Sequence, residues 1–480
     1  MRAIVILLFT WSLGPLVAAP AKEYRIMAVG DSITEGGGTF SNWRYPLFEK
    51  LYTAGYFVEF VGTRSSPSRI GELAHEGYGG KTSTYLAATV PGNFKKHPAD
   101  IVLLHAGHNQ SSDQKPVPVI LKDIEGLIGS FRAINPKVVV LLAQPIPSGK
   151  LPKYAYIPEL QDELLKLGKR LDRPDSRVVI VPQGKDFDPV KDTGADQVHP
   201  NASGAQKMAQ RWFDALTGVL EKPAQAYQPE IITYKKAAKG DLTLHVFKPA
   251  GTAATPRPVI VFFFGGGWAR GTPMQFYPEC THFAAKGMVA ISVDYRTSFS
   301  HGTTPFDAVA DAKSAIRYVR AHARELGIDP EKIVAAGASA GGQLAAATAM
   351  LSGLDDAVDD LTVSPRPNAL ALWYPVLDNG PDGFGDPNVK ARFKEFSPLH
   401  NISASTPPCI FFLGTRDAHL SVATAKEFQA KLLQQKVRCD LHTLPDGIHP
   451  LYSWRVPNPP LRNQILSQID AFLQGEKMQW

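Results

Sequence analysis

The chain has 480 residues, of which 44% are hydrophobic and 20% charged, a composition typical of folded globular proteins rather than disordered ones. The formal net charge is +6, and without Lys/Arg-rich runs this small excess predicts no binding to nucleic acid or to a membrane surface. The three cysteines, Cys280, Cys409 and Cys439, exclude a disulfide framework and a clustered Cys/His metal motif.

The first 21 residues have the pattern of a secretory signal peptide. Arg2 precedes an apolar run over 3–13, and small residues follow at Ala18, Ala19 and Ala21. A charged start, a short apolar core and an A-x-A ending are typical of such signals, and the run is too short to span a membrane. We therefore expect removal of residues 1–21 and a secreted protein, extracellular or periplasmic.

Residues 22–220 are predicted to form one α/β domain. Short runs rich in Val, Ile, Leu and Phe do not alternate with polar residues, which is typical of strands buried on both faces of a parallel sheet. Helical patterns lie between them, so the segment predicts βαβ units in a three-layer sandwich. The expected strands are 25–30, 57–62, 101–105, 138–143 and 178–181, and the expected helices are 45–54, 118–134, 157–171 and 202–220.

A linker is predicted over 221–229, where two prolines interrupt a stretch with few apolar residues. Residues 230–480 then predict a second α/β domain, which begins with a hairpin of two strands and continues as a parallel, doubly wound sheet. The expected strands are 231–234, 242–248, 259–264, 289–294, 333–337, 369–373, 410–414 and 439–444, and the clearest helices are 306–326 and 422–435.

The first domain carries a dispersed set of residues suited to serine chemistry. Ser32 follows the first expected strand, where ligands of open α/β sheets bind. Asp196 and His199 lie three residues apart before the last helix, so a carboxylate can orient an imidazole that takes the serine proton. Gly80 and Asn109 can supply N–H groups to an oxyanion.

These motifs resemble the SGNH (GDSL-type) hydrolases, and most closely their acetylxylan-esterase-like branch. The matching segments are GDSITEG at 30–36, YPL at 45–47, AGY at 54–56 and FVG at 60–62. The resemblance implies a flavodoxin-like sandwich, Ser32 as nucleophile with Asp196 and His199, and Gly80 and Asn109 in the oxyanion hole. One position departs from the family: Gln110 stands where the family has Asp, which puts the support of this loop in question.

The second domain carries a different serine motif. Residues 337–341 read GASAG after an expected strand and before an Ala-rich segment, which is the strand–turn–helix context of a nucleophile elbow. Asp417 and His449 follow later strands in the order serine, acid, base. The backbone N–H groups of Ala340, Gly265 and Gly266 are the expected oxyanion donors. His419 and His442 are rival bases, which we interpret as a loop residue and a strand residue.

This half resembles α/β-hydrolase esterases of the carboxylesterase/lipase and feruloyl–acetylxylan esterase types. The family's glycine-rich loop begins with His, whereas this chain has Phe264 there, so the loop must be anchored differently. Trp268, Phe276, Trp373 and Tyr374 are equally compatible with stacking on a sugar or ferulate ring and with the core.

Together the two motifs predict an enzyme with two serine sites and no cofactor. Both resemblances imply acetylated or feruloylated polysaccharide, plant cell-wall xylan above all, as substrate. Two alternatives remain: a carboxylesterase or lipase acting on small or lipid esters, and a chain in which one domain is a non-catalytic glycan-binding module. No metal site is expected, because His97, His105 and His108 have no carboxylate at a clear spacing.

Overall fold

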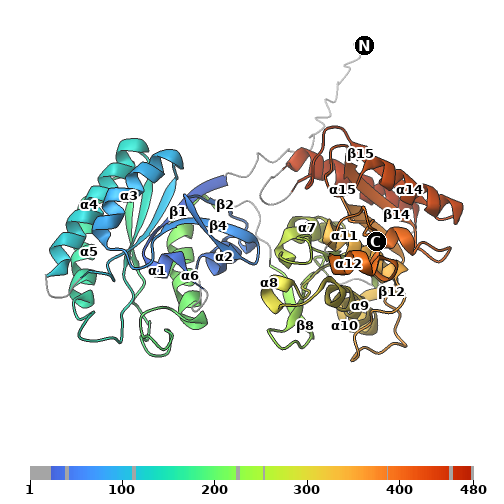
Figure 1. The fold of residues 1–480 in the computed structure, drawn as a ribbon, viewed down its shortest axis with the longest axis horizontal. Coiled ribbons are helices and arrows are strands. Elements are labelled where there is room, and N and C mark those ends of the chain that lie inside the picture. Colours follow the sequence, from blue (N-terminus) through green and yellow to red (C-terminus); the bar gives the residue numbers. More distant parts are fainter. Residues whose placement is uncertain are drawn as a thin grey trace, which may run out of the picture.

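Two α/β units make up the molecule, each built on its own sheet (Figure 1). The computed structural model describes residues 23–37, 43–110, 115–222, 228–251, 255–385, 387–452 and 458–476. The expected signal peptide and most of the expected linker lie outside these residues.

The first sheet has the strand order β3-β4-β1-β5-β6-β7, with β2 also paired to β1. All its pairings are parallel except that between β3 and β4. Its strands are β1 (Glu23–Gly30), β2 (Phe57–Phe60), β3 (Arg64–Ser68), β4 (Gly71–Gly77), β5 (Ile101–His105), β6 (Val139–Gln144) and β7 (Val178–Pro182).

Helices cover both faces of this sheet, as the unalternating strands predict. Along β5, Leu103 packs in one hydrophobic cluster and its neighbour Leu104 in another, because successive side chains of a strand point to opposite faces. The helices are α1 (Ser32–Glu35), α2 (Arg44–Thr53), α3 (Ser83–Lys96), α4 (Pro116–Ile134), α5 (Ile157–Leu171) and α6 (Ala202–Thr217). Helices α2 and α6 share the first cluster, and α3, α4 and α5 share the second, so the three-layer sandwich is confirmed.

The hairpin of β3 and β4 is a feature that the sequence did not predict. Strand β3 has the sequence RSSPS and is largely exposed, so it lacks the apolar pattern by which strands are recognised. Its antiparallel pairing with β4 supplies the order that its own composition does not. The turn of this hairpin, around Arg69, reaches the second unit.

The second sheet has the order β15-β14-β13-β12-β10-β11-β9-β8. The expected entry hairpin is present, because β8 pairs antiparallel with β9, and β9 pairs antiparallel with β11. The remaining pairings are parallel. The strands are β8 (Glu230–Lys235), β9 (Leu242–Phe247), β10 (Arg257–Phe263), β11 (Val289–Val293), β12 (Ile328–Ala338), β13 (Ala369–Trp373), β14 (Cys409–Gly414) and β15 (Cys439–Leu444).

The helix expected over 306–326 is divided at His322 into α9 (Pro305–Ala321) and α10 (Ala323–Leu326). Helix α11, the Ala-rich segment after the GASAG motif, is buried along its whole length. The other helices are η2 (Pro273–Phe276), α7 (Tyr277–Ala285), α8 (Ser298–His301), α11 (Ala340–Met350), α12 (Pro387–Ala391), α13 (Phe393–Phe396), η3 (Pro398–His400), α14 (Val422–Gln434) and α15 (Pro459–Gly475).

The three cysteines are buried thiols, so no disulfide contributes to this fold. In the described part of the chain, no helix combines the length and apolar character that crossing a bilayer requires.

A buried histidine is expected to make the first unit sensitive to acid. His75 in β4 accepts a hydrogen bond from the Gly77 N–H (2.9 Å) and lies 3.0 Å from the Ser66 hydroxyl. Burial, and then the charges of Arg44 and Arg64, lower its pKa to about 3. The folded state therefore holds His75 neutral at pH values where an unfolded chain, with a His pKa near about 6.5, binds a proton.

We predict that wild type loses stability as the pH falls below the unfolded His pKa, and that His75→Gln loses less. The difference in unfolding free energy should change by up to about 1.4 kcal/mol for each pH unit down toward pH 4. Urea unfolding at pH 4, 5, 6 and 7 measures it. Equal losses in both proteins would show that His75 does not stay neutral in the fold.

Candidate active sites

Ser32 lies at the carboxyl end of β1, as the first residue of α1. Asp31 caps this helix, since its Oδ1 accepts the Ile33 N–H at 3.0 Å. Strand β1 is a central strand that pairs with β5 through Gly30 and His105. The serine is therefore fixed at the middle of the sheet edge, where neighbouring strand ends and loops converge on it.

The structure brings together the three residues that the sequence assigns to the first site. His199 Nε2 lies 2.8 Å from the Ser32 hydroxyl oxygen, and His199 Nδ1 contacts Asp196 Oδ2. The other carboxylate oxygen accepts the backbone N–H groups of Val198 and His199, each at 3.0 Å. Burial raises the pKa of Asp196, but these hydrogen bonds outweigh it and leave the pKa below its usual value. Asp196 is thus an ionised orienting group.

The expected oxyanion donors of this site are on loops beside Ser32. Asn109 donates one amide hydrogen to the Lys81 carbonyl at 3.1 Å, which leaves its second amide hydrogen for a ligand. Gly80 follows Gly79, where a Cβ would lie 3.8 Å from Ser32 Cβ. The loop of Gly79 and Gly80 therefore lies beside the serine, and Asn109 is attached to the next residue of that loop, Lys81.

Gln110 supports the Asn109 loop in place of the family's aspartate. Its amide nitrogen donates to Ser83 Oγ at 2.8 Å, and its amide oxygen accepts the Ser83 N–H at 3.3 Å. The loop is thereby attached to the start of α3, so the question raised by the Asp-to-Gln departure is answered by a neutral pair of hydrogen bonds.

Ser339 occupies a strained turn between β12 and α11. Its φ is 54° and its ψ is −121°, a conformation rarely adopted by residues other than glycine. A Cβ at Gly341 would overlap the carbonyl oxygens of Phe263 and Phe264, so this sharp turn requires glycine. The GASAG segment therefore has the geometry of a nucleophile elbow.

The second set of three residues is also assembled. His449 Nε2 lies 2.8 Å from the Ser339 hydroxyl oxygen, and His449 Nδ1 lies 2.8 Å from Asp417 Oδ2. Asp417 Oδ1 accepts the backbone N–H groups of His419 and Leu420. Burial raises the Asp417 pKa, but the hydrogen bonds from His449 and these amides lower it by more, so the pKa lies below its usual value.

One expected oxyanion donor of the second site is already in use. The Gly265 N–H donates to Gln275 Oε1 at 2.8 Å, so Gly265 as it stands cannot donate to a ligand. Gly266 follows in the same loop, and the Ala340 N–H belongs to the first turn of α11, where backbone N–H groups have no helical acceptor. The structure therefore favours Gly266 and Ala340 over Gly265.

The rival histidines do not contact the serine. His442 stacks on Phe412 within the sheet, and the His419 ring packs 4.2 Å from the His449 ring. Trp268, Phe276, Trp373 and Tyr374 are all buried, which favours their interpretation as core. Sequence reasoning missed Phe384, whose ring lies 4.3 Å from that of His419.

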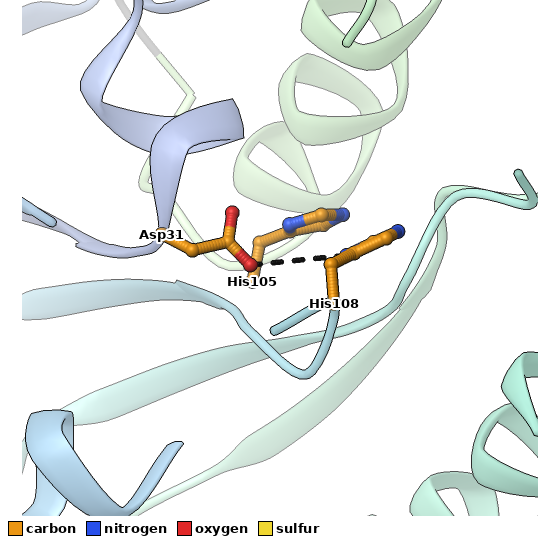
Figure 2. Close-up of side chains that lie close together, drawn as sticks. All are labelled: Asp31, His105 and His108. Atoms are coloured by element: carbon orange, nitrogen blue, oxygen red, sulfur yellow. Dashed lines mark ion pairs between the residues drawn. The ribbon is translucent and has the colours of Figure 1, made fainter. Parts of the chain in front are cut away.

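A buried cluster behind Ser32 escaped the sequence analysis. Asp31, His105 and His108 each offer an atom within 4.8 Å of the others (Figure 2). Asp31 is the carboxylate that the sequence spacing did not reveal, so that argument against a metal was incomplete. Asp31 Oδ2 and the Nδ1 atoms of both histidines have no hydrogen-bond partner among the described residues.

The hydrogen bonds of the two rings determine what this cluster can bind. His108 Nε2 donates to the Ile146 carbonyl at 2.9 Å, which leaves a lone pair on its Nδ1. His105 Nε2 accepts the Ile146 N–H at 3.4 Å, which assigns its proton to Nδ1. A metal requires a lone pair from each ring, so these tautomers do not fit a metal ion.

Both units thus have the fold and the geometry of serine-dependent hydrolases. The GDSL-like Lipase/Acylhydrolase family matches residues 28–207, and the family named BD-FAE matches residues 244–378. The apo form of Thermogutta terrifontis esterase 2 is 40% identical, with a TM-score of 0.51, over 54% of this chain and 99% of that one. The chain therefore belongs to the α/β-hydrolase esterases in its second half, fused behind a GDSL-like lipase/acylhydrolase half.

Curated relatives match shorter parts of the chain. Esterase LipC of Mycobacterium tuberculosis is 28% identical over 39% of this chain and 51% of its own length. Carboxylesterase NlhH of the same organism is 38% identical over 25% of this chain and 35% of its own length. Endo-1,4-beta-xylanase B of Butyrivibrio fibrisolvens is 25% identical over 39% of this chain and 31% of its own length. The chain thus spans about half or less of these relatives.

The tautomers of the Asp31 cluster make a prediction about metals. Because His105 Nδ1 carries a proton, we expect ester turnover to be unchanged after dialysis against a chelator and after addition of zinc. Elemental analysis of the purified protein and initial rates before and after dialysis measure this. One equivalent of tightly held zinc, lost in Asp31→Asn, would contradict the assignment.

Proposed function

We propose that both halves of the chain hydrolyse carboxylic esters through a serine acyl-enzyme. The observation that carries this proposal is the pair of separate Ser–His–Asp sets, each with its serine hydroxyl 2.8 Å from a histidine Nε2. At that distance the imidazole can take the serine proton as the oxygen attacks.

In the proposed reaction, the serine Oγ attacks the ester carbonyl while His199 or His449 takes its proton. The oxyanion accepts hydrogen bonds from Asn109 and Gly80 at the first site, and from Gly266 and Ala340 at the second. The imidazolium then protonates the leaving alcohol. Water, activated by the same imidazole, attacks the acyl group and releases the acid. The ionised Asp196 and Asp417 orient the imidazoles and stabilise their charged forms.

The two sites differ in how open they are. At the first site the His199 side chain is 25% exposed and that of Asp196 is 46% exposed. At the second, the corresponding values for His449 and Asp417 are 10% and 0%. An open site admits an ester on a bulky polymer, whereas an enclosed site favours a smaller or more extended group. We infer that the first site takes esters attached directly to a bulky polymer, and that the second takes esters on smaller or more extended groups, including feruloyl side groups of a polymer.

Acetylated and feruloylated xylan is the substrate that we propose for the pair. The motifs of the first half resemble acetylxylan esterases, and a relative of this chain is named an endo-1,4-beta-xylanase. Beside the second site lies a cavity of about 300 Å³, lined by Gly267, Trp268, Gly383, Phe384, Gly385 and Lys390. The Phe384 ring in this lining is partly exposed, which suits contact with a ferulate or a sugar ring.

A general carboxylesterase is the second candidate. It is favoured by Thermogutta terrifontis esterase 2 and carboxylesterase NlhH, whose names specify an ester bond and no polymer. Under this candidate both sites would prefer simple small or lipid esters, and acetylated glycans would be poor substrates.

We predict that the two serines release different products from acetylated, feruloylated arabinoxylan. Ser32→Ala should abolish most acetate release, and Ser339→Ala should abolish ferulate or a separate share of acetate. Each substitution should lower turnover at its own site on the order of 10⁴-fold, because the nucleophile is lost. Acetate and ferulate are quantified for wild type, both single variants and the double variant.

The double variant is the control for background hydrolysis. A silent Ser32→Ala or Ser339→Ala would assign that half a binding or structural role. Release of neither product by wild type, together with turnover of simple acyl esters, would exclude xylan and favour the carboxylesterase candidate.

A further inference from the structure

We propose that Arg69 of the first half is a positioning residue for the oxyanion loop of the second half. This loop is residues 264–271, which follow β10 and include Gly265 and Gly266. The inference rests on the proposed function, since it concerns how well the Ser339 site stabilises an oxyanion. Under this proposal, a residue of the first half completes the Ser339 site, which lies in the second half.

The loop lacks the anchor that its family resemblance implies. Where that family has His, Phe264 stacks on the Tyr295 ring, with 4.0 Å between centroids and 15° between planes. The Tyr295 hydroxyl donates to the Phe264 carbonyl at 2.7 Å. These contacts fix the beginning of the loop but leave its end, at residues 270 and 271, to be held by something else.

Arg69 holds that end from the other half of the molecule. Its Nε donates to the Gly271 carbonyl at 2.9 Å, while its own carbonyl accepts the Gly271 N–H at 2.7 Å. Arg270 donates in return to the Ser68 carbonyl at 2.8 Å. The turn between β3 and β4 is thus paired with the loop through both backbone and side chain.

An ion pair fixes the Arg69 side chain in this position. Its terminal nitrogen contacts Asp294, which follows β11, and the two side chains are only 20% and 9% exposed. Burial lowers the Arg69 pKa, but the charge of Asp294 outweighs this effect and keeps the pKa above its usual value. Arg69 is therefore a permanent cation, and a buried pair of this kind leaves an uncompensated charge when one partner is removed.

The two ends of the loop are packed against each other, and the beginning of the loop is packed against Ser339. A Cβ at Gly271 would lie 2.5 Å from the Gly265 carbonyl oxygen, and one at Gly266 would overlap the Arg270 carbonyl. A Cβ at Gly265 would in turn lie 3.2 Å from Ser339 Cβ. Since close-packed backbone transmits displacement, a shift of Gly271 moves the oxyanion donors relative to the nucleophile.

The test uses the full chain with one site silenced at a time. In a Ser32→Ala background, Arg69→Met should lower kcat at the Ser339 site on the order of 10- to 100-fold, since misplacement by about 1 Å costs up to about 10²-fold. KM should change less than about twofold, because the oxyanion contact is stronger in the transition state than in the ground state. Affinity for a boronic acid, which mimics the tetrahedral intermediate, should fall in parallel with kcat.

Two controls separate positioning from general damage. In a Ser339→Ala background, Arg69→Met should leave kcat at the Ser32 site within about twofold of its parent. Thr53→Val removes another contact between the halves, the 3.3 Å hydrogen bond from Thr53 Oγ1 to Met274 Sδ, which does not involve the loop. It should leave kcat at both sites unchanged.

Arg69→Lys keeps a cation beside Asp294 but lacks the Nε–H that the Gly271 carbonyl accepts, so it remains informative if Arg69→Met does not fold. We expect a loss of kcat at the Ser339 site for Arg69→Lys as well. An unchanged kcat in either variant, or an equal fall at both sites, would overturn the inference. Absence of any Ser339-dependent hydrolysis in the Ser32→Ala parent would instead refute the proposed function.

Discussion

The constraint on which both halves depend is that a serine hydroxyl does not attack an ester until a neighbouring base takes its proton. Each sheet satisfies it by placing a serine at the carboxyl end of a central strand, β1 or β12, within 2.8 Å of an imidazole. The acid and base come from later segments that reach the same edge of the sheet. The parallel topology therefore brings residues that are far apart in the sequence together at one reactive site.

The two units meet this constraint in different ways. Ser339 is held in a strained turn by glycines that let the backbone of α11 approach β10. Ser32 instead begins a short helix capped by Asp31, without positive φ at the nucleophile. The turn at Ser339 stores strain in the backbone. The turn at Ser32 relies instead on a buried polar group, Asp31, whose pKa is raised by burial even though His108 lies nearby.

Most of the architecture and both Ser–His–Asp sets were predictable, because buried parallel strands and the motifs at their ends have strong local signals. The β3–β4 hairpin was not, since β3 is polar and exposed and is ordered by its partner. The Asp31 cluster joins residues about 75 positions apart, and the use of the Gly265 N–H by Gln275 depends on how a loop folds back on itself; sequence spacing reveals neither contact. The role of Arg69 also depends on contacts with the other half, and its sequence context gave no signal, because an isolated arginine is usually a surface residue.

Contact between the halves gives the fusion a physical meaning beyond two proposed esterase sites on one chain. The α2 helix and the β3–β4 turn of the first unit lie against the segment from Arg270 to Met274 in the second, and α2 lies on the side of the first unit that faces the second (Figure 1). The loop that carries the proposed oxyanion donors of the second site is thus part of the boundary between the units.

Above all, we propose that this one chain carries two reactive serines. Labelling of the intact wild-type protein with a fluorophosphonate, followed by mass measurement and peptide mapping, tests it most directly. We expect two adducts per chain, one on Ser32 and one on Ser339, each lost when that serine is replaced by alanine. A single adduct, or none at saturating reagent, would contradict it.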